Sequence, residues 1–236
     1  MLNRFNYLFS VINTKRGRLI FAVIVALVIS FALFGNSLKG DFVFDDTIVV
    51  VGNPLIKGGV PDIGEIFSTS YHAYQPRTGL YRPLTILSFA INASVFGFSP
   101  TSFHVVNVIL YALGAFLLFL LASRLAGNRA GWISLLVFLF MPVHAEAVAS
   151  IVGSAELLAL VFGLASLLAF HSNRFWQASL WFLLGLLSKE ITIAIIPVAL
   201  MMSLVAKGFS WRRLMREFVP VLISVTVYSA LRWYAL

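Results

Sequence analysis

The sequence contains no cysteine, which excludes disulfides and thiolate metal sites. Without cysteine, the sequence does not indicate whether the protein lies in an oxidising or a reducing compartment. Charge is also scarce, because only 11% of the 236 residues are Asp, Glu, Lys or Arg. By contrast, 60% are hydrophobic and the mean hydropathy is +0.95, a composition that soluble globular domains do not have. The chain is therefore predicted to cross a membrane several times.

Long apolar runs make up most of the chain. They are continuous and lack the alternation of barrel strands, so they predict helices. We therefore predict an all-α polytopic membrane protein, a single transmembrane domain over residues 1–236 with about seven membrane-spanning helices. These lie near residues 19–38, 103–122, 130–142, 154–170, 175–188, 190–206 and 218–235.

The few charges are distributed unevenly between the loops. Arg4, Lys15, Arg16 and Arg18 precede the first span, which is long for a signal peptide and lacks a cleavage site. An uncleaved signal anchor with a cytoplasmic N-terminus is therefore predicted. In that orientation Glu217 is the only one of the 9 acidic residues on the cytoplasmic side. The net charge of +8 then reflects membrane orientation and does not indicate a nucleic-acid partner.

The loop at residues 39–101 is the only long one, and it falls on the outer side. Apolar residues recur at helical spacing over residues 60–71, and residues 83–97 form a second apolar segment too short to span comfortably. Ser99 and Pro100 have the pattern of a helix cap and first turn. We therefore expect two short interfacial helices in this extracytoplasmic loop.

Two of the predicted spans are shorter than the roughly 20 residues that a full crossing needs. Pro142 ends one of them, and Lys189-Glu190 interrupts another. Polar helix tips below the membrane surface are tolerated only against protein or a water-filled cavity. The sequence therefore predicts an outward-facing cavity with His144, Glu146, Lys189 and Glu190 at its rim.

Asp45 and Asp46 follow the first span directly and lie at the same level as this cavity. A partly desolvated carboxylate can remove a proton from an acceptor hydroxyl, and a second carboxylate beside it could help to hold a divalent cation. The alternative is an idle, solvated turn, because neighbouring acids are common. Their position at a membrane exit favours a catalytic role.

Three cations are candidates for binding a phosphate. The planar fork of Arg82 suits phosphate oxygens, although Arg82 could equally extend to lipid headgroups. Lys189 and Arg232 are the other two candidates. Glu156 lies within an apolar run, where a carboxylate is costly and usually faces a partner such as Arg232.

The histidines give weaker signals. His104 and Asn107 lie one turn apart at the start of a span, where they could face the cavity or simply be polar helix-end residues. His144 and Glu146 are two residues apart, which does not match the i, i+4 spacing of a helical metal pair. His144 is best interpreted as a hydrogen-bonded interfacial side chain. No metal ligand is therefore assigned from the sequence. Binding of a divalent cation shared with Asp45 or Asp46 is left as an alternative.

Several longer motifs occur together in a consistent order. They are FVFDD (42–46), YRPLT (81–85), SPTSFHVVNVILYAL (99–113), MPVHAEAVASIVGSAELLA (141–159), SKE (188–190) and LR (231–232). Together they resemble the membrane region of the protein O-mannosyltransferase-like family with C-terminal tetratricopeptide repeats, and bacterial members in particular. The resemblance runs from about residue 42 to residue 232.

This resemblance implies a GT-C glycosyltransferase fold in a multi-pass protein of the bacterial inner membrane. It further implies an inverting transfer from a polyprenyl-phosphate sugar donor to a protein or glycan acceptor on the extracytoplasmic face. The family's catalytic base maps to Asp45, with Asp46 in support. The positions expected to bind substrate or donor phosphate are Arg82, His104, His144, Glu146, Glu156, Lys189, Glu190 and Arg232.

The sequence also departs from the family pattern. Met141 and Ser154 stand where His and Arg are expected, which weakens phosphate binding through that segment. Family members continue into further spans and repeats, so we expect this chain to correspond to the N-terminal membrane region without the repeat domain. A non-catalytic or truncated partner subunit is therefore an alternative. A transporter or flippase is another, although no inverted repeat supports it.

Overall fold

The computed structural model describes residues 14–57, 62–73 and 79–236, and within these ranges it is built from helices without any β-strand. In this part of the chain five helices are long and apolar enough to cross a membrane, or six if a bent pair is counted. The prediction of an all-α polytopic membrane protein is thus confirmed. The long helices are α2 (Lys15–Phe34) with η1 (Gly35–Lys39), α6 (Pro100–Ala126), η5 (Ile151–Gly153) with α9 (Ser154–His171), η6 (Glu190–Ala194) with α11 (Ile195–Lys207), and α12 (Trp211–Ala235).

The number of full crossings in the described residues is smaller than the seven predicted from the sequence. α10 (Phe175–Ser188) is 14 residues long. It therefore measures roughly 21 Å, less than the about 30 Å of hydrocarbon in a bilayer. α7 (Asn128–Phe140) is also short, and it continues after a bend of 56° into η4 (Pro142–His144) and α8 (Ala145–Ala149). Both early helix ends predicted from the sequence are therefore present.

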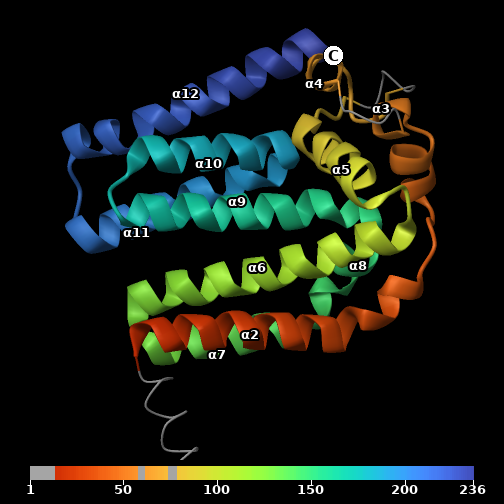
Figure 1. The fold of residues 1–236 in the computed structure, drawn as a ribbon. Helices are drawn as coiled ribbons and strands as arrows, with labels where there is room; N and C mark the ends of the chain where they lie inside the picture. Colours follow the sequence, from red (N-terminus) through yellow and green to blue (C-terminus); the bar gives the residue numbers. More distant parts are fainter. Residues whose placement is uncertain (1–13, 58–61, 74–78) are drawn as a thin grey trace, which may run out of the picture.

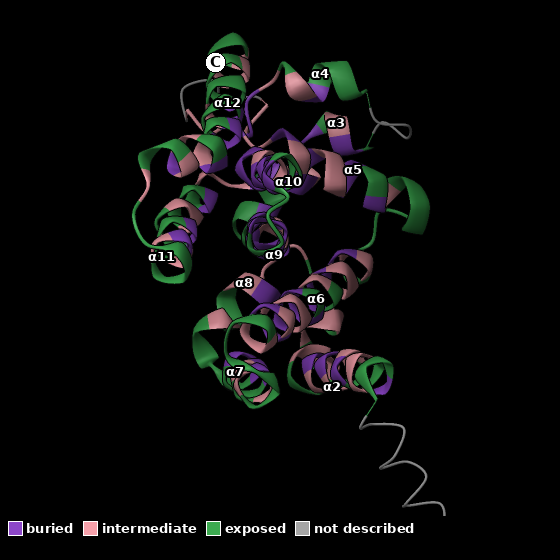
Figure 2. Cartoon of the chain, turned by 90° about the vertical axis from the view of Figure 1, so that its left-hand side faces the viewer, coloured by how far each residue is buried: buried purple, intermediate pink, exposed green. Residues whose placement is uncertain are grey.

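The helices form two groups that meet along α6, as Figure 1 shows. α2 and α7 pack on one side of α6 and α9 on the other, and α10 then lies between α9 and α12. Ala22 and Ala26 of α2 are buried in one cluster with Ala112 and Ala115 of α6. Small residues let membrane helices approach closely, so the contact between these two helices depends on dispersion rather than on polar bonds. The outward faces of α2, α7, α11 and α12 are exposed (Figure 2) and suited to lipid.

The long loop contains more helical turns than the sequence predicted. The second short helix is confirmed as α5 (Pro83–Phe96), whereas the first is reduced to α4 (Ile63–Phe67), capped by Asp62. Residues 60 and 61 lie outside the described ranges. A π-helical turn, η2 (Thr47–Val51), and α3 (Pro54–Lys57) were not predicted. α6 begins at Pro100 as expected, but the Ser99 side chain makes no capping bond.

Charge separates the two ends of the bundle. One end, here called the basic end, carries Arg124, Arg129, Arg174, Lys207, Arg212, Arg213 and Arg216 on helix ends that lie together at the left of Figure 1. Glu217 is the acid at this end. It is 1% exposed, accepts a hydrogen bond of 2.5 Å from Ser203, and pairs with Lys207 at 3.1 Å and with Arg213 at 3.7 Å. The remaining carboxylates gather toward the opposite end, where the long loop lies.

Candidate active-site cavity

A cavity of about 200 Å³ lies at the end of the bundle opposite the basic end. Its walls come from Asp45 and η2, the segment before α5, α8 with η5, the start of α9, and the break between α10 and η6. Five of the residues predicted from the sequence line it, namely Asp45, Arg82, Glu146, Glu156 and Lys189. The other lining residues are Val49, Tyr71, His72, Leu80, Ala147, Ser150, Val152 and Gly153.

The two neighbouring aspartates have different surroundings. Asp45 is exposed and lines the cavity. Asp46 is 1% exposed, and its two carboxylate oxygens accept hydrogen bonds from the backbone N–H groups of Val152 at 2.9 Å and Val43 at 3.2 Å. Phe44, just before the pair, has a φ of 47°, a left-handed conformation that is unusual for a bulky residue. Asp46 therefore ties the loop to η5, while Asp45 is left free to meet a ligand.

Asp46→Asn should destabilise the protein, because an amide can accept through only one oxygen and its NH₂ group would face a backbone donor. We expect the free energy of unfolding to fall by about 1–3 kcal/mol. Thermal or denaturant unfolding of the purified protein in detergent measures this change. Asp45→Asn is the matched control, since its exposed side chain should change stability by no more than about 0.5 kcal/mol. Equal stability of the two variants would contradict the anchoring role of Asp46.

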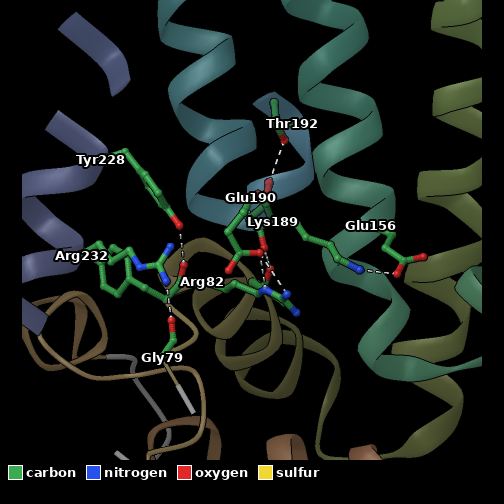
Figure 3. A network of polar contacts seen from close by, with 11 residues as sticks. Gly79, Arg82, Glu156, Lys189, Glu190, Thr192, Tyr228 and Arg232 are labelled. Atoms are coloured by element: carbon green, nitrogen blue, oxygen red, sulfur yellow. Dashed lines mark hydrogen bonds and ion pairs between the residues drawn. The ribbon is translucent and has the colours of Figure 1, made fainter. Parts of the chain in front are cut away.

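Within the described part of the chain, each cation that lines the cavity is paired with a carboxylate (Figure 3). The Nε and Nη2 groups of Arg82 donate to Glu190 Oε2 at 3.1 and 3.0 Å, and the guanidinium also lies 5.1 Å from the centre of the Tyr71 ring. Lys189 donates to Glu156 in a second ion pair. The positive charges of Arg82 and Lys189 are therefore neutralised by neighbouring carboxylates. An incoming anion would have to compete with these carboxylates for the two cations.

The break between α10 and η6 is what brings these pairs together. Lys189 has an extended backbone, so the helix stops there and the chain restarts as η6. Thr85 of α5 donates a hydrogen bond of 2.8 Å to the carbonyl of Ser188, which joins the loop helix to this break. Gly185 leaves room for Thr192, because a Cβ at Gly185 would lie 2.6 Å from Thr192 Cγ2.

Tyr71 and His72 line the cavity, although neither was predicted from the sequence as a site residue. Burial raises the pKa of Tyr71 well above its usual range, against the opposing effect of Arg82. Burial lowers the pKa of His72, against the opposing effect of Asp45. Both side chains are therefore neutral at pH 7 and can offer hydrogen bonds without adding charge. Tyr71 is held in place because its N–H donates to the carbonyl of Leu80 at 2.9 Å.

Besides the buried Asp46, four of the predicted site residues do not line the cavity. Arg232 donates to the carbonyl of Gly79 at 2.8 Å and lines a separate cavity of about 650 Å³ near the end of α12. Glu190 lies behind Arg82 as its ion-pair partner. His104 is 3% exposed and packs under Gly40.

His144 is the fourth. The expectation of a hydrogen-bonded interfacial side chain is not met at Nε2, which has no hydrogen-bond partner among the described residues. The ring packs instead against Phe138, with 4.2 Å between ring centres, and against Tyr111 at 5.7 Å.

Asn107 supports the cavity wall from behind. Its Nδ2 donates to the carbonyl of Ser150 at 2.7 Å, and its Oδ1 accepts from the Ser154 hydroxyl. The sequence placed Asn107 near the cavity as one of two alternatives, but it is fully buried beneath the wall. It pairs with backbone carbonyls that the interrupted helix leaves without a partner. Unpaired carbonyls would be costly to bury within a bilayer.

The described side chains do not form a metal centre. In residues 14–57, 62–73 and 79–236, no group of three or more His, Cys, Asp or Glu residues is placed to hold a metal ion. The divalent cation considered from the sequence therefore has no ligand set in this part of the chain.

Comparison with known proteins adds to this geometry. The chain is 36% identical over 146 residues to protein O-mannosyl-transferase TMTC1 of Mus musculus, a match that covers 59% of the chain. It is 33% identical over 195 residues to a protein O-mannosyl-transferase of Caenorhabditis elegans, and 32% identical over 209 residues to TMTC4 of Mus musculus, with 78% and 74% of the chain covered. This chain is related to the protein O-mannosyl-transferases.

These matches span only part of each relative. The chain covers 16% of the length of TMTC1 and 28% of the length of the other two proteins. No protein-family model matches the chain, and no solved structure gives a significant match. The relationship therefore supports an O-mannosyl-transferase-like membrane protein, and it agrees with the resemblance found in the sequence motifs.

Proposed function

We propose that the cavity is the catalytic site of a membrane glycosyltransferase that moves a sugar from a polyprenyl-phosphate donor to an acceptor hydroxyl. The observation that carries this proposal is the convergence of Asp45, Arg82 and Lys189 on one cavity, in a chain related to protein O-mannosyl-transferases. A carboxylate and two cations are the groups that such a transfer needs.

In the proposed reaction Asp45 acts as general base. Its carboxylate takes the proton of the acceptor hydroxyl as the acceptor oxygen attacks the anomeric carbon of the sugar. The new carbon–oxygen bond forms while the bond from the anomeric carbon to the lipid-phosphate oxygen breaks, and the lipid phosphate leaves with the electron pair. One direct displacement inverts the anomeric configuration, because no covalent sugar–enzyme intermediate is formed.

Arg82 and Lys189 would stabilise the charge that develops on the leaving phosphate. Both already bind carboxylates, so the proposal requires each ion pair to open or to share its cation with the phosphate. Because the guanidinium presents several donors, Arg82 can keep Glu190 and still contact an additional oxygen. The neutral Tyr71 and His72 side chains are placed to contact uncharged sugar hydroxyls.

The proposal also includes an orientation. We infer that the basic end faces the cytoplasm, because basic residues near helix ends favour the cytoplasmic side. The cavity then opens on the extracytoplasmic side of a bacterial inner membrane, where a polyprenyl-phosphate sugar would present its headgroup. The acceptor hydroxyl would belong to a protein or glycan on the same side.

Sugar transfer in proteoliposomes tests the proposal. The purified protein should move radiolabelled mannose from polyprenyl-phosphate mannose to a Ser- and Thr-containing acceptor protein. Arg82→Gln and Lys189→Gln should each lower kcat/KM for the donor by about 10²-fold, because each removes one charge facing the leaving group. Arg129→Gln, an exposed cation at the basic end, is the matched control and should retain full activity.

Unchanged transfer in both cavity variants would contradict the proposed donor site. Absence of transfer by the unaltered protein, with a relative active in the same vesicles, would overturn the proposed function itself. A transporter is not favoured, because Arg232 lies in a different cavity from Glu156 and Lys189. Those three side chains therefore do not form one substrate pathway.

A further inference from the structure

A second charged cavity lies at the basic end, between α6, α9 and the start of α10. Its volume is about 290 Å³. Arg124 of α6 and Arg174, in the turn before α10, lie at its rim together with Ser172 and Gln177. These four polar side chains come from three segments that are distant from the proposed catalytic cavity.

The two arginines differ from the cations that are paired with carboxylates. Arg82, Lys189, Lys207 and Arg213 each bind a carboxylate. Among the described residues, neither Arg124 nor Arg174 makes an ion pair, and Arg124 has only a hydrogen bond of 3.3 Å to the Ser172 hydroxyl. Two guanidinium groups beside one cavity, without a neutralising acid, have the charge and the donors to bind a phosphate group.

The remaining wall of this cavity is apolar. Leu117, Ala165, Leu168, Ala169 and Trp181 line it below the polar rim. Leu117 and Arg124 are seven residues apart on α6, so the cavity runs roughly 10 Å along the helix from its polar tip into its apolar part. A free phosphate would leave this wall uncovered, whereas the acyl chains of a lipid would cover it.

We propose that this cavity binds an anionic phospholipid from the leaflet at the basic end. The headgroup phosphate lies between Arg124 and Arg174, with Ser172 and Gln177 as additional donors. The acyl chains follow Leu117 and Trp181 toward the centre of the membrane. Basic pockets between membrane helices bind anionic headgroups in this way. The site is independent of the proposed sugar transfer.

Quenching of Trp181 by brominated lipids tests the site. In a protein that keeps Trp181 as its only tryptophan, with the other four replaced by Phe, bromine atoms in a bound acyl chain report occupancy directly. In detergent micelles, brominated phosphatidylglycerol should quench Trp181 at a much lower mole fraction than phosphatidylcholine with the same chains. Arg124→Gln/Arg174→Gln should weaken the phosphatidylglycerol affinity roughly 30-fold, as expected for two cations near a lipid headgroup.

Arg129→Gln/Arg212→Gln is the matched control. It removes the same charge from exposed residues of the basic end that do not line the cavity, and it should keep the lipid preference. Equal quenching by the two lipids, or an equal loss in both double variants, would overturn the proposal. Competition with soluble glycerol phosphate is a further test. If glycerol phosphate displaced the lipid at equal concentration, the cavity would be a site for free phosphate and the lipid proposal would be wrong. Arg124→Lys/Arg174→Lys should bind phosphatidylglycerol more tightly than the Gln variant, and failure to do so would also count against the proposal.

Discussion

Asp45→Asn is expected to lower sugar transfer by about 10²–10⁴-fold, the contribution typical of a general base. The amide has the shape of the carboxylate but cannot take the acceptor proton, so the chemical step should fail while the donor still binds. Steady-state transfer from polyprenyl-phosphate mannose should therefore show a reduced kcat with little change in the KM for the donor. Among the described residues Asp45 makes no anchoring bond comparable to those of Asp46, so the variant should fold normally.

Asp41→Asn is the matched control for this experiment. Asp41 is another exposed acid of the same loop, and its carboxylate bonds to the N–H of its neighbour Phe42. Its replacement should leave transfer unchanged. An Asp45→Asn protein with near-normal kcat would remove this carboxylate from the mechanism. Equal losses in both variants would indicate a general effect of loop charge instead.

Gly153→Ala should destabilise the protein, because this cavity wall has no space for a side chain. A Cβ at Gly153 would lie 2.7 Å from the Ala147 carbonyl carbon and 2.9 Å from its Cα, and still closer to its oxygen. That backbone cannot retreat easily, because Asn107 donates to the carbonyl of the next residue, Val148, at 3.4 Å and to that of Ser150 at 2.7 Å. Overpacking of this kind costs about 1–3 kcal/mol of unfolding free energy.

The displaced wall should also reduce sugar transfer, because Gly153 and Ala147 both line the cavity. Gly35→Ala is the control, since a Cβ at Gly35 would meet nothing within 4 Å and its φ is −59°. Gly35→Ala should be neutral or slightly stabilising by its effect on the unfolded chain. Denaturant unfolding measures the free energy of unfolding of both variants. If Gly153→Ala were as stable as Gly35→Ala, the cavity wall would have space for the added methyl group and the prediction would be wrong.

The helical architecture could be predicted from the sequence because its cause is local. Continuous apolar runs require helices in a bilayer, and Pro142 and Lys189-Glu190 mark where two helices stop early. The break between α8 and η5 could not be predicted, because it depends on contacts that Asn107 makes with carbonyls more than 40 residues away, such as that of Ser150. The turns η2 and α3 depend in the same way on packing of the loop against α5 and η5.

Only part of the cavity could be predicted, because hydropathy gives the depth of a residue but not the direction of its side chain. Arg232 lies in the last turn of α12 and His144 in the three-residue turn η4, so no periodic pattern shows which neighbour each side chain meets. Asp45 and Asp46 are adjacent in sequence, yet the left-handed Phe44 and the π turn send them to different surroundings. Tyr71 enters the cavity only because the loop returns to Leu80.

Arg82 is synthesised well before the carboxylate that pairs with it. Glu190 lies 108 residues further along the chain, and α5, α6, α7, α9 and α10 are all made in between. At a synthesis rate of about 5–20 residues per second, roughly 5–20 s pass before the two side chains can meet. During that interval the guanidinium has to remain among water or lipid headgroups. The loop that forms part of the proposed catalytic cavity can therefore close onto the membrane helices only after α10 and η6 have been inserted.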